Sequence, residues 1–341
     1  LVGSEMCIRD RIYNYLLMIV CLLIICSCND EWKDEQYNQY ISFKAPVDSK
    51  GCTQINVRYK KDGKTSYKLP VIVSGSTMNE KDLNIHFAVD PDTLDIFNIE
   101  RFNTRTELFY EELPSEYYSF SETLQIPAGD CVGLLDVDFS LKDLDMVEKW
   151  ILPITVTDDP SYNYQSNLRK HYRKALLRIM PFNDFSGSYS TTAMKTYFYD
   201  SDKNETVGDA MVANTRTAYV VNDSTVFFYA GLMDEDLERS KRRLYKIYVK
   251  FNADKSLTLE ADNDDIKFEV PDGTTPIYST TKNMDATRPY IEHRYTTLRL
   301  TYLFNDITSA PVPIRYKVTG TLLLERKINL QIPDEDQAIE W

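Results

Sequence analysis

Hydrophobic residues alternate with polar residues along most of the chain, and this alternation is the feature that most restricts the possible fold. In residues 54–60, Ile55, Val57 and Tyr59 fall on one side of an extended chain, and the residues between them are polar. A period of two residues is typical of a β-strand with one buried face. The same pattern recurs at Leu83, Ile85, Phe87 and Val89, at Leu135, Val137, Phe139 and Leu141, at Tyr245, Ile247, Val249 and Phe251, at Leu298, Leu300, Tyr302 and Phe304, and at Tyr316, Val318, Leu322 and Leu324.

Helical periodicity, in contrast, is almost absent. One short candidate, residues 234–243, has few apolar residues and is expected to form a connecting turn or a single solvated helix. Many short strands separated by turn residues are typical of β-sandwiches and β-barrels. The sequence therefore predicts an all-β protein.

A break between two series of strands lies near residue 182. A predicted strand that ends at Met180 is followed by Pro181 and then by the turn formers Asn, Asp, Ser and Gly. We therefore expect a first domain over residues 41–181 and a second over residues 182–341. Each domain is large enough to bury its own core.

The charge balance narrows the class of partner. The chain has 52 acidic and 39 basic residues, which gives a formal net charge of −13. Such a chain repels phosphate backbones unless it carries a strong basic patch, and its basic run Lys241-Arg242-Arg243 is short. Nucleic acids and anionic membrane surfaces are therefore poor candidates, whereas a neutral ligand such as a sugar is compatible with this charge.

Motifs for catalysis or for cofactor binding are not found. The three histidines are far apart, and the chain has no phosphate-binding loop, dinucleotide fingerprint or nucleophile elbow. We therefore predict no catalytic residue, no metal and no cofactor. Residues 262–265 offer carboxylates that suit calcium but lack the spacing of a calcium loop, so a solvated acidic turn is the favoured interpretation. Whether Cys52 and Cys131 form a disulfide stays open.

The N-terminal segment has the composition of a targeting signal. An uncharged apolar run at residues 16–26 follows Arg9 and Arg11, which is the arrangement of a secretory signal. This run is too short to span a bilayer as a helix. Residues 1–27 are therefore interpreted as a signal peptide, of which residues 1–11 resemble translated adaptor sequence and are left out of the fold interpretation.

The end of the apolar run resembles a bacterial lipobox. Its sequence, ICSC at residues 25–28, makes Cys28 the expected lipidated first residue, with an ordinary signal peptide and a stray cysteine as the alternative. The NDE sequence at residues 29–31 resembles the surface-export signal of lipoproteins in the Bacteroidetes phylum. The expected location is the outer membrane, with a lipid anchor and the protein facing the cell exterior. Residues 28–40 are polar and acidic and are expected to form a tether.

Four short pieces of the chain resemble, in their order, a two-domain lipoprotein family of Bacteroidetes. The pieces are YKLPV at residues 67–71, QIPAG at 125–129, LPITVT at 152–157 and NDFSGSY at 183–189. The resemblance implies an immunoglobulin-like β-sandwich followed by a second antiparallel β-sandwich or barrel-like domain. Members of that family resemble accessory surface glycan-binding proteins of polysaccharide-utilisation loci. The implied function is to bind an oligosaccharide or polysaccharide and to assist its uptake by a neighbouring outer-membrane importer and its lipoprotein partner.

Aromatic residues in polar segments are the expected sugar contacts. The C–H face of a pyranose packs on Tyr or Trp, while its hydroxyls need donors and acceptors nearby. Residues 271–293 are interpreted as a long polar loop that supplies both, with a surface loop that binds no ligand as the alternative. The candidate glycan-binding residues are Tyr278, Asn283, Asp285, Arg288, Tyr290 and the C-terminal Trp341.

Two other functions stay open on the sequence alone. Sandwich domains on a lipid anchor also serve as adhesins or surface-assembly subunits, which exposed edge strands would favour. The first domain also resembles a module found ahead of glycoside hydrolase barrels. Residues 183–341 are, however, shorter than the roughly 250 residues of a (β/α)₈ barrel and rich in strands, so no enzymatic activity is predicted.

Overall fold

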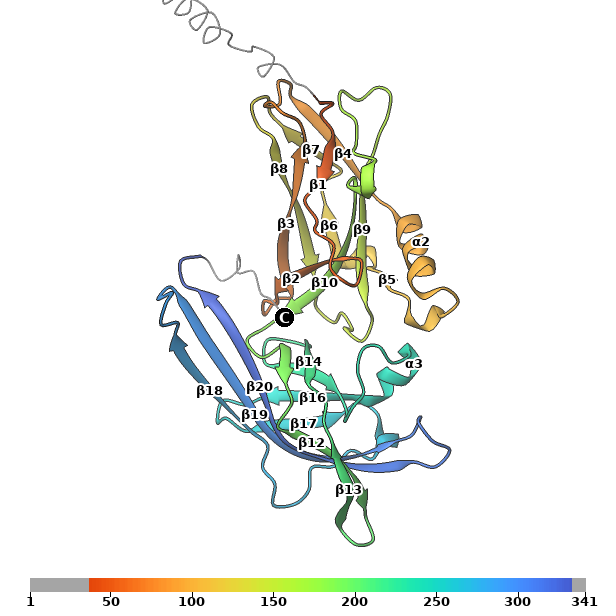
Figure 1. The fold of residues 1–341 in the computed structure, drawn as a ribbon, viewed down its shortest axis with the longest axis vertical. Coiled ribbons are helices and arrows are strands. Elements are labelled where there is room, and N and C mark those ends of the chain that lie inside the picture. The colour runs from red at the N-terminus through yellow and green to blue at the C-terminus, as the bar shows by residue number, and fades with distance from the viewer. Residues whose placement is uncertain (1–36, 333–341) are drawn as a thin grey trace, which may run out of the picture.

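The computed structural model describes residues 37–332, and most of their regular structure is β-strand. Two domains follow each other along the long axis of the molecule (Figure 1). The all-β fold predicted from the alternation is confirmed, and it is divided into two domains. The predicted signal peptide, the tether up to residue 36, Cys28 and Trp341 lie outside the described residues. Within the described range, the helices are too short or too polar to cross a lipid bilayer.

The first domain is a β-sandwich of two sheets. The first sheet has the order β1 (Ile41–Phe43), β3 (Lys64–Val73), β8 (Val132–Ser140) and β6 (Tyr118–Phe120). The second sheet has the order β2 (Thr53–Arg58), β10 (Lys174–Phe182), β9 (Trp150–Val156), β4 (Leu83–Val89) and β7 (Thr123–Ile126), with β5 (Glu111–Glu112) beside β9. All pairings are antiparallel except those of β10 with β2 and of β5 with β9.

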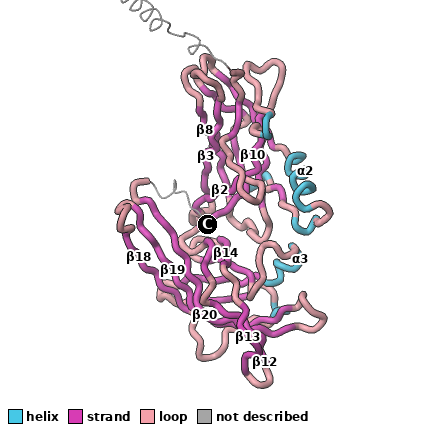
Figure 2. Tube along the Cα trace, viewed as in Figure 1, coloured by secondary structure: helices cyan, strands magenta, loops and turns pink. Residues whose placement is uncertain are grey.

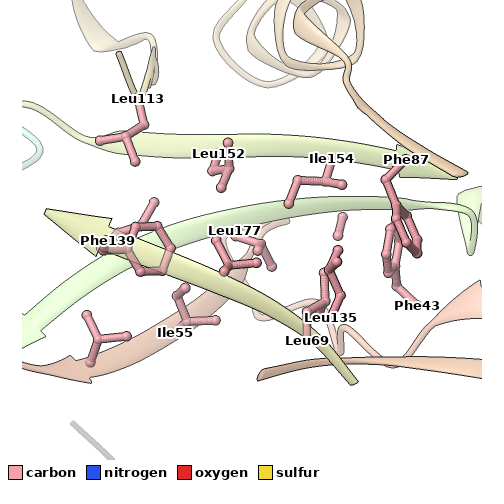
Figure 3. Close-up of a cluster of buried hydrophobic side chains, with 14 of the residues drawn as sticks. Phe43, Ile55, Leu69, Phe87, Leu113, Leu135, Phe139, Leu152, Ile154 and Leu177 are labelled. Atoms are coloured by element: carbon pink, nitrogen blue, oxygen red, sulfur yellow. The ribbon is translucent and has the colours of Figure 1, made fainter. Parts of the chain in front are cut away.

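Alternate residues of the facing sheets fill the sandwich core. Leu69 and Leu135 extend from the first sheet and Leu152 and Leu177 from the second, and all four are at most 1% exposed (Figure 3). Each such side chain contributes about 1.5–3 kcal/mol by leaving water. The residues predicted to face a core are all buried, apart from three at or near strand ends that are half-buried: Tyr59, Val89 and Tyr316.

A twelve-residue helix, α2 (Pro91–Phe102), was not expected from the sequence. Asp90 caps it by accepting hydrogen bonds from the backbone N–H of Thr93 at 3.2 Å and from its hydroxyl at 2.6 Å. Asn98, on the buried side of the helix, donates to the carbonyl of Tyr110 at 2.9 Å and accepts from its N–H at 2.8 Å. A polar side chain, Asn98, therefore holds the helix against the sandwich. Because this buried position is polar, the helix lacks a continuous apolar face, and the sequence pattern does not reveal it.

The second domain is one curled antiparallel sheet. Its strands are β11 (Gly187–Ser190), β12 (Met194–Asp200), β13 (Glu205–Met211), β14 (Thr215–Val220), β15 (Thr225–Tyr229), β16 (Lys246–Phe251), β17 (Leu257–Ala261), β18 (Ile277–Met284), β19 (Ile291–Asp306) and β20 (Ile314–Asn329). The order is β13-β12-β20-β11-β14-β15-β16-β17, and β19 and β18 follow along the other edge of β20. A bridge between Ser256 and Ile277 joins the start of β17 to that of β18, so the sheet closes on itself. The barrel-like alternative of the sequence interpretation is therefore the one observed.

A glycine on β20 lets two strands share one edge. The pairing of β12 with β20 begins at Met194 and Gly320, and β11 pairs further along β20, at Leu323. Gly320 has a φ of 138°, and a Cβ there would lie 2.2 Å from the carbonyl oxygen of Ala193. Only glycine allows this close approach of the two backbones.

The boundary between the domains is a tight turn held by side-chain hydrogen bonds. The side chain of Asn183 accepts from the N–H groups of Phe185 and Ser186 at 2.9 and 2.8 Å. Arg326 of β20 donates to the carbonyls of Asn183 and Ser186 at 2.7 and 2.6 Å, and its guanidinium lies 5.5 Å from the ring centre of Phe182. The end of β10 is therefore bonded directly to the second domain.

Charged and aromatic side chains fill the rest of the contact between the domains. Glu235 of the second domain accepts from Arg178 of β10 at 2.6 Å and from the hydroxyl of Tyr219 at 2.8 Å, and it pairs with Lys50. The side chain of Arg178 is 4% exposed. Three aromatic residues of β14 and β15 belong to the same hydrophobic cluster as the sandwich core: Tyr219, Phe227 and Tyr229.

The segment predicted as a turn or a solvated helix, residues 234–243, packs on the first domain. It contains the four-residue helix α3 (Arg239–Arg242). The expectation of solvent exposure was wrong for Arg242, which is 1% exposed and donates from Nε to the carbonyl of Val147 at 3.0 Å. The partner lies far away in the sequence, so local charge patterning does not reveal this contact.

Candidate functional site

The segment interpreted as a long polar loop, residues 271–293, is mostly a β-hairpin. β18 and the start of β19 pair in register from Ile277 opposite Arg299 to Met284 opposite Glu292 (Figure 2). Except for its second residue, β18 is exposed throughout. A strand without a hydrophobic face shows no period-two pattern, which is why the sequence interpretation took it for a loop.

Tyr278, a predicted sugar contact, is a core residue. It is 7% exposed, and its ring meets Phe251 and Phe185 edge-on at centroid distances of 4.9 and 5.7 Å. The ammonium group of Lys255 lies 4.7 Å from the ring centre, and the hydroxyl donates to the carbonyl of Asn252 at 3.0 Å. The ring has no free face, so the prediction that it stacks on a sugar was wrong.

Asp285 organises the turn between β18 and β19. Its Oδ1 accepts from the N–H and the hydroxyl of Thr287 at 2.9 and 2.8 Å and from the N–H of Arg288 at 2.9 Å. Its Oδ2 contacts the guanidinium of Arg288 at 3.3 Å and Nε2 of His293 at 3.2 Å. The predicted pair Asp285 and Arg288 is therefore brought together, with the Arg288 side chain 53% exposed.

The other predicted residues lie around the same turn or outside the described range. Asn283 is exposed and stands directly opposite His293 in the hairpin register. Tyr290 is 38% exposed, and its carbonyl accepts from the N–H of Leu330 at 2.9 Å. Asn283, Asp285, Arg288 and Tyr290 therefore share one end of the hairpin. Trp341 is not among the described residues.

Three residues that the sequence interpretation did not propose complete this surface. Nδ1 of His293 lies 2.7 Å from Oε1 of Glu325, and the hydroxyl of Tyr295 donates to the same oxygen at 3.3 Å. The rings of His293 and Tyr295 are nearly parallel, at 17°, with centroids 6.2 Å apart. We call Asp285, His293, Tyr295 and Glu325 the hairpin cluster. The signal for it was the i, i+2 spacing of His293 and Tyr295, which places both on one face once the segment is known to be a strand.

Hydrogen bonds set the charge state of the hairpin cluster. The side chain and N–H of Thr287, the N–H of Arg288 and the ring of His293 hold the pKa of Asp285 well below its usual value. Glu325 first, and Asp285 second, raise the pKa of His293 above 6.5. Glu325, whose side chain is 42% exposed, therefore supplies an acceptor at the surface, beside the half-buried imidazole of His293 and the half-buried phenol ring of Tyr295. A carboxylate, an imidazole and an aromatic ring are groups that can bind the hydroxyls and a C–H face of a neutral sugar.

The remaining polar groups singled out from the sequence form ordinary structure. In residues 262–265, Asn263 accepts from the N–H of Asp265 at 3.1 Å and caps a short turn. Cys52 and Cys131 are free thiols, and burial raises the pKa of Cys52 to about 11. In the part of the chain that the structure describes, no three His, Cys, Asp or Glu side chains are placed to hold a metal ion together.

Family models match both parts of the chain. A domain of unknown function, DUF4973, matches residues 32–160, and a model described as a C-terminal domain matches residues 173–323. No curated protein matches the chain.

Solved structures match the whole described fold. A protein of unknown function from Bacteroides ovatus is 50% identical, with a TM-score of 0.81 over 89% of this chain and 100% of that one. The chain belongs to this family of two-domain Bacteroides proteins. The family also contains an auxiliary nutrient binding protein from Bacteroides thetaiotaomicron, which is 44% identical, with a TM-score of 0.79 over 89% of this chain and 100% of that one. Another member, from Bacteroides ovatus, is 48% identical and is described as a multidomain protein including DUF1735.

Proposed function

We propose that this protein is a cell-surface lipoprotein that binds an oligosaccharide or polysaccharide and assists its uptake by a neighbouring outer-membrane importer. The observation that carries the proposal is the 44% identity, over the full length of that chain, to a protein described as an auxiliary nutrient binding protein. That description supports binding of a nutrient. We further propose that the nutrient is a glycan, that a lipid anchors the protein and that a neighbouring importer takes up the glycan.

A neutral glycan fits the hairpin cluster better than a charged nutrient does. The half-buried ring of Tyr295 offers contact area, and the carboxylate of Glu325 offers an acceptor that His293 and Tyr295 already hold in place. Rigid, pre-bonded groups lose little entropy when a hydroxyl binds to them. Because the chain carries a net charge of −13, an anionic nutrient would be repelled.

The proposed anchor is consistent with where the chain enters the fold. Residue 37 lies at the end of the sandwich that is remote from the second domain (Figure 1). A lipid on Cys28 would therefore keep the second domain away from the membrane, where a polymer can reach it. A Cys28→Ala variant should move from the membrane to the soluble fraction of cells, and a variant that stays with the membrane would reject the anchor.

Affinity electrophoresis tests glycan binding directly. The purified protein is run through native gels that contain yeast mannan, laminarin, arabinoxylan, pectic galactan or dextran, and at least one polysaccharide should retard it. A Tyr295→Ala variant should bind that polysaccharide about tenfold more weakly, because stacking and ring burial are worth on the order of 1.5 kcal/mol. The matched control is Tyr172→Ala, since Tyr172 is a 45% exposed tyrosine of the first domain.

The outcomes separate the parts of the proposal. Retardation by none of the polysaccharides rejects glycan binding. Retardation that Tyr295→Ala leaves unchanged rejects the hairpin cluster as the site but keeps the function. We also propose capture without cleavage, so incubation with the bound polysaccharide should release no new reducing ends.

A further inference from the structure

A groove lies at the end of the second domain opposite to the hairpin cluster. It is lined by residues 198–201 and Val207 of the β12–β13 hairpin and by residues 310–315 at the turn between β19 and β20, and its volume is about 670 Å³. The hairpin cluster lies at the far end of the same two long strands (Figure 1). The two surfaces are separated by nine residue-to-residue steps along β20, from Tyr316 to Glu325, which corresponds to about 30 Å of strand.

A ladder of aromatic rings leads from the core of the second domain into this groove. Phe304 is 1% exposed and stacks on Tyr316 with centroids 5.5 Å apart. Tyr316 stacks in turn on Phe198, at 5.2 Å and 30°. Phe198 is 42% exposed, so the ladder ends in an aromatic ring that solvent reaches. Its position is fixed, because β12 and β20 place Phe198 directly opposite Tyr316 in the register.

Apolar side chains surround this ring, and polar side chains form the rim. Val207 stands directly opposite Phe198 on β13 and is 46% exposed, and Val312 is 71% exposed. On the rim, Asp200 pairs with Lys203 at 3.1 Å. Arg315 is held by Glu269 at 2.8 Å and by Asn305 at 3.2 Å, and its side chain is 18% exposed. The groove therefore combines an apolar floor with fixed charged groups at its edge.

We propose that this groove is a second glycan-binding subsite, in which the C–H face of a pyranose stacks on Phe198 and its hydroxyls meet the polar rim. The proposal rests on the proposed function. A volume of about 670 Å³ falls within the roughly 300–1,000 Å³ of small-ligand sites. An apolar floor with a few oriented polar groups is the chemistry that a sugar ring requires.

Two subsites on one domain favour polymers over short oligosaccharides. A chain long enough to reach both surfaces gains affinity because its second contact is intramolecular. The groove and the hairpin cluster share no residue and lie about 30 Å apart along β20. The two contributions should therefore be nearly independent.

The test uses the polysaccharide that retards the wild-type protein most in the gel panel. A Phe198→Ala variant should bind about tenfold more weakly, whereas Phe198→Tyr keeps the ring face and should bind as the wild type does. The matched control is Ile96→Ala on α2, since Ile96 is a 55% exposed apolar residue of the first domain. The double variant Phe198→Ala/Tyr295→Ala should lose about a hundredfold. Thermal unfolding of each variant checks that it is folded.

Each outcome decides one question. Wild-type retardation together with unchanged binding by folded Phe198→Ala overturns the groove and leaves the proposed function intact. Equal loss in Phe198→Ala and Phe198→Tyr also overturns it, because a stacking face is then not what the site needs. If no polysaccharide in the panel retards the wild type, the proposed function is rejected, and the glycan assignment of the groove is rejected with it.

Discussion

Replacing Glu235 by Gln should weaken the contact between the two domains. The carboxylate accepts from Arg178 at 2.6 Å and from the hydroxyl of Tyr219 at 2.8 Å, and it pairs with Lys50. Gln keeps the shape but loses the charge, so Arg178, whose side chain is 4% exposed, stays buried without a counter-ion. Breaking an enclosed pair in this way costs about 3–5 kcal/mol. Because the Glu235 side chain is 18% exposed and partly screened, we expect a loss of about 2–4 kcal/mol.

Urea unfolding measures this loss. With a slope of about 3 kcal/mol/M for a chain of this size, the midpoint should fall by roughly 1 M. Calorimetry should show one transition for the wild type and a separation into two for Glu235→Gln, since the domains then unfold more independently. The matched control is Glu238→Gln in the same segment. Glu238 pairs with Lys241 at 3.0 Å, and its side chain is 36% exposed, so the change should stay within about 0.5 kcal/mol.

The same variant should change how stability depends on pH. Burial alone would raise the pKa of Glu235, but the charges of Arg178 and Lys50 outweigh burial and hold its pKa below the ordinary 4.5. A carboxyl whose pKa is lower in the folded state stabilises the fold above its unfolded pKa, and this stability is lost as the pH falls below about 4.5. Glu235→Gln should flatten the fall in stability below pH 4.5. A loss under about 1 kcal/mol at pH 7, or a loss equal to that of Glu238→Gln, would refute the reasoning.

Three further predictions concern the backbone, the hairpin cluster and the core. Gly320→Ala should destabilise the second domain by more than about 1 kcal/mol in urea unfolding, because its Cβ would lie 2.2 Å from the carbonyl oxygen of Ala193; an unchanged midpoint would contradict this. The pKa of His293, followed by NMR, should lie above 6.5, and Glu325→Gln should bring it back toward 6.5. Because the pKa of His293 is raised in the folded state, the stability that His293 contributes is present below pH 6.5 and is lost as the pH rises through the folded pKa. Leu177→Ala should cost about 2–5 kcal/mol, because this 0% exposed side chain fills the sandwich core, and a loss under 1 kcal/mol would count against that packing.

Strands with one buried face could be predicted from the sequence because apolar and polar residues alternate along them. Ile247 and Val249 are 0% exposed, as their alternation indicates. β18 could not be found in this way, because almost all of its side chains are exposed and its polar sequence reads as a loop. α2 carried one clear signal, Asp90 before Pro91, which is the usual start of a helix, but Asn98 interrupts its apolar face.

The sequence predicts which segment carries the candidate site, but it does not predict which side chains contact one another there. Asp285 and Arg288 meet because they are three residues apart in one turn. Glu325 joins His293 only through the pairing of β19 with β20, and Tyr278 is buried by Phe185 and Phe251, which lie on other elements. Such partners depend on register and on closure of the sheet, which residue spacing alone does not give.

Because the second domain follows β10 directly, without a linker, the first domain holds the second domain as a rigid support would. β10 pairs with β2 as far as Phe182, and the next residues are already bonded to Arg326 of the second domain. Because these bonds leave no hinge between the domains, the orientation of the first domain also fixes the direction in which the hairpin cluster and the groove face. A ligand that pulls on the second domain therefore loads the sandwich through β10, which is paired on both sides, with β2 and with β9, so that several backbone hydrogen bonds must break together.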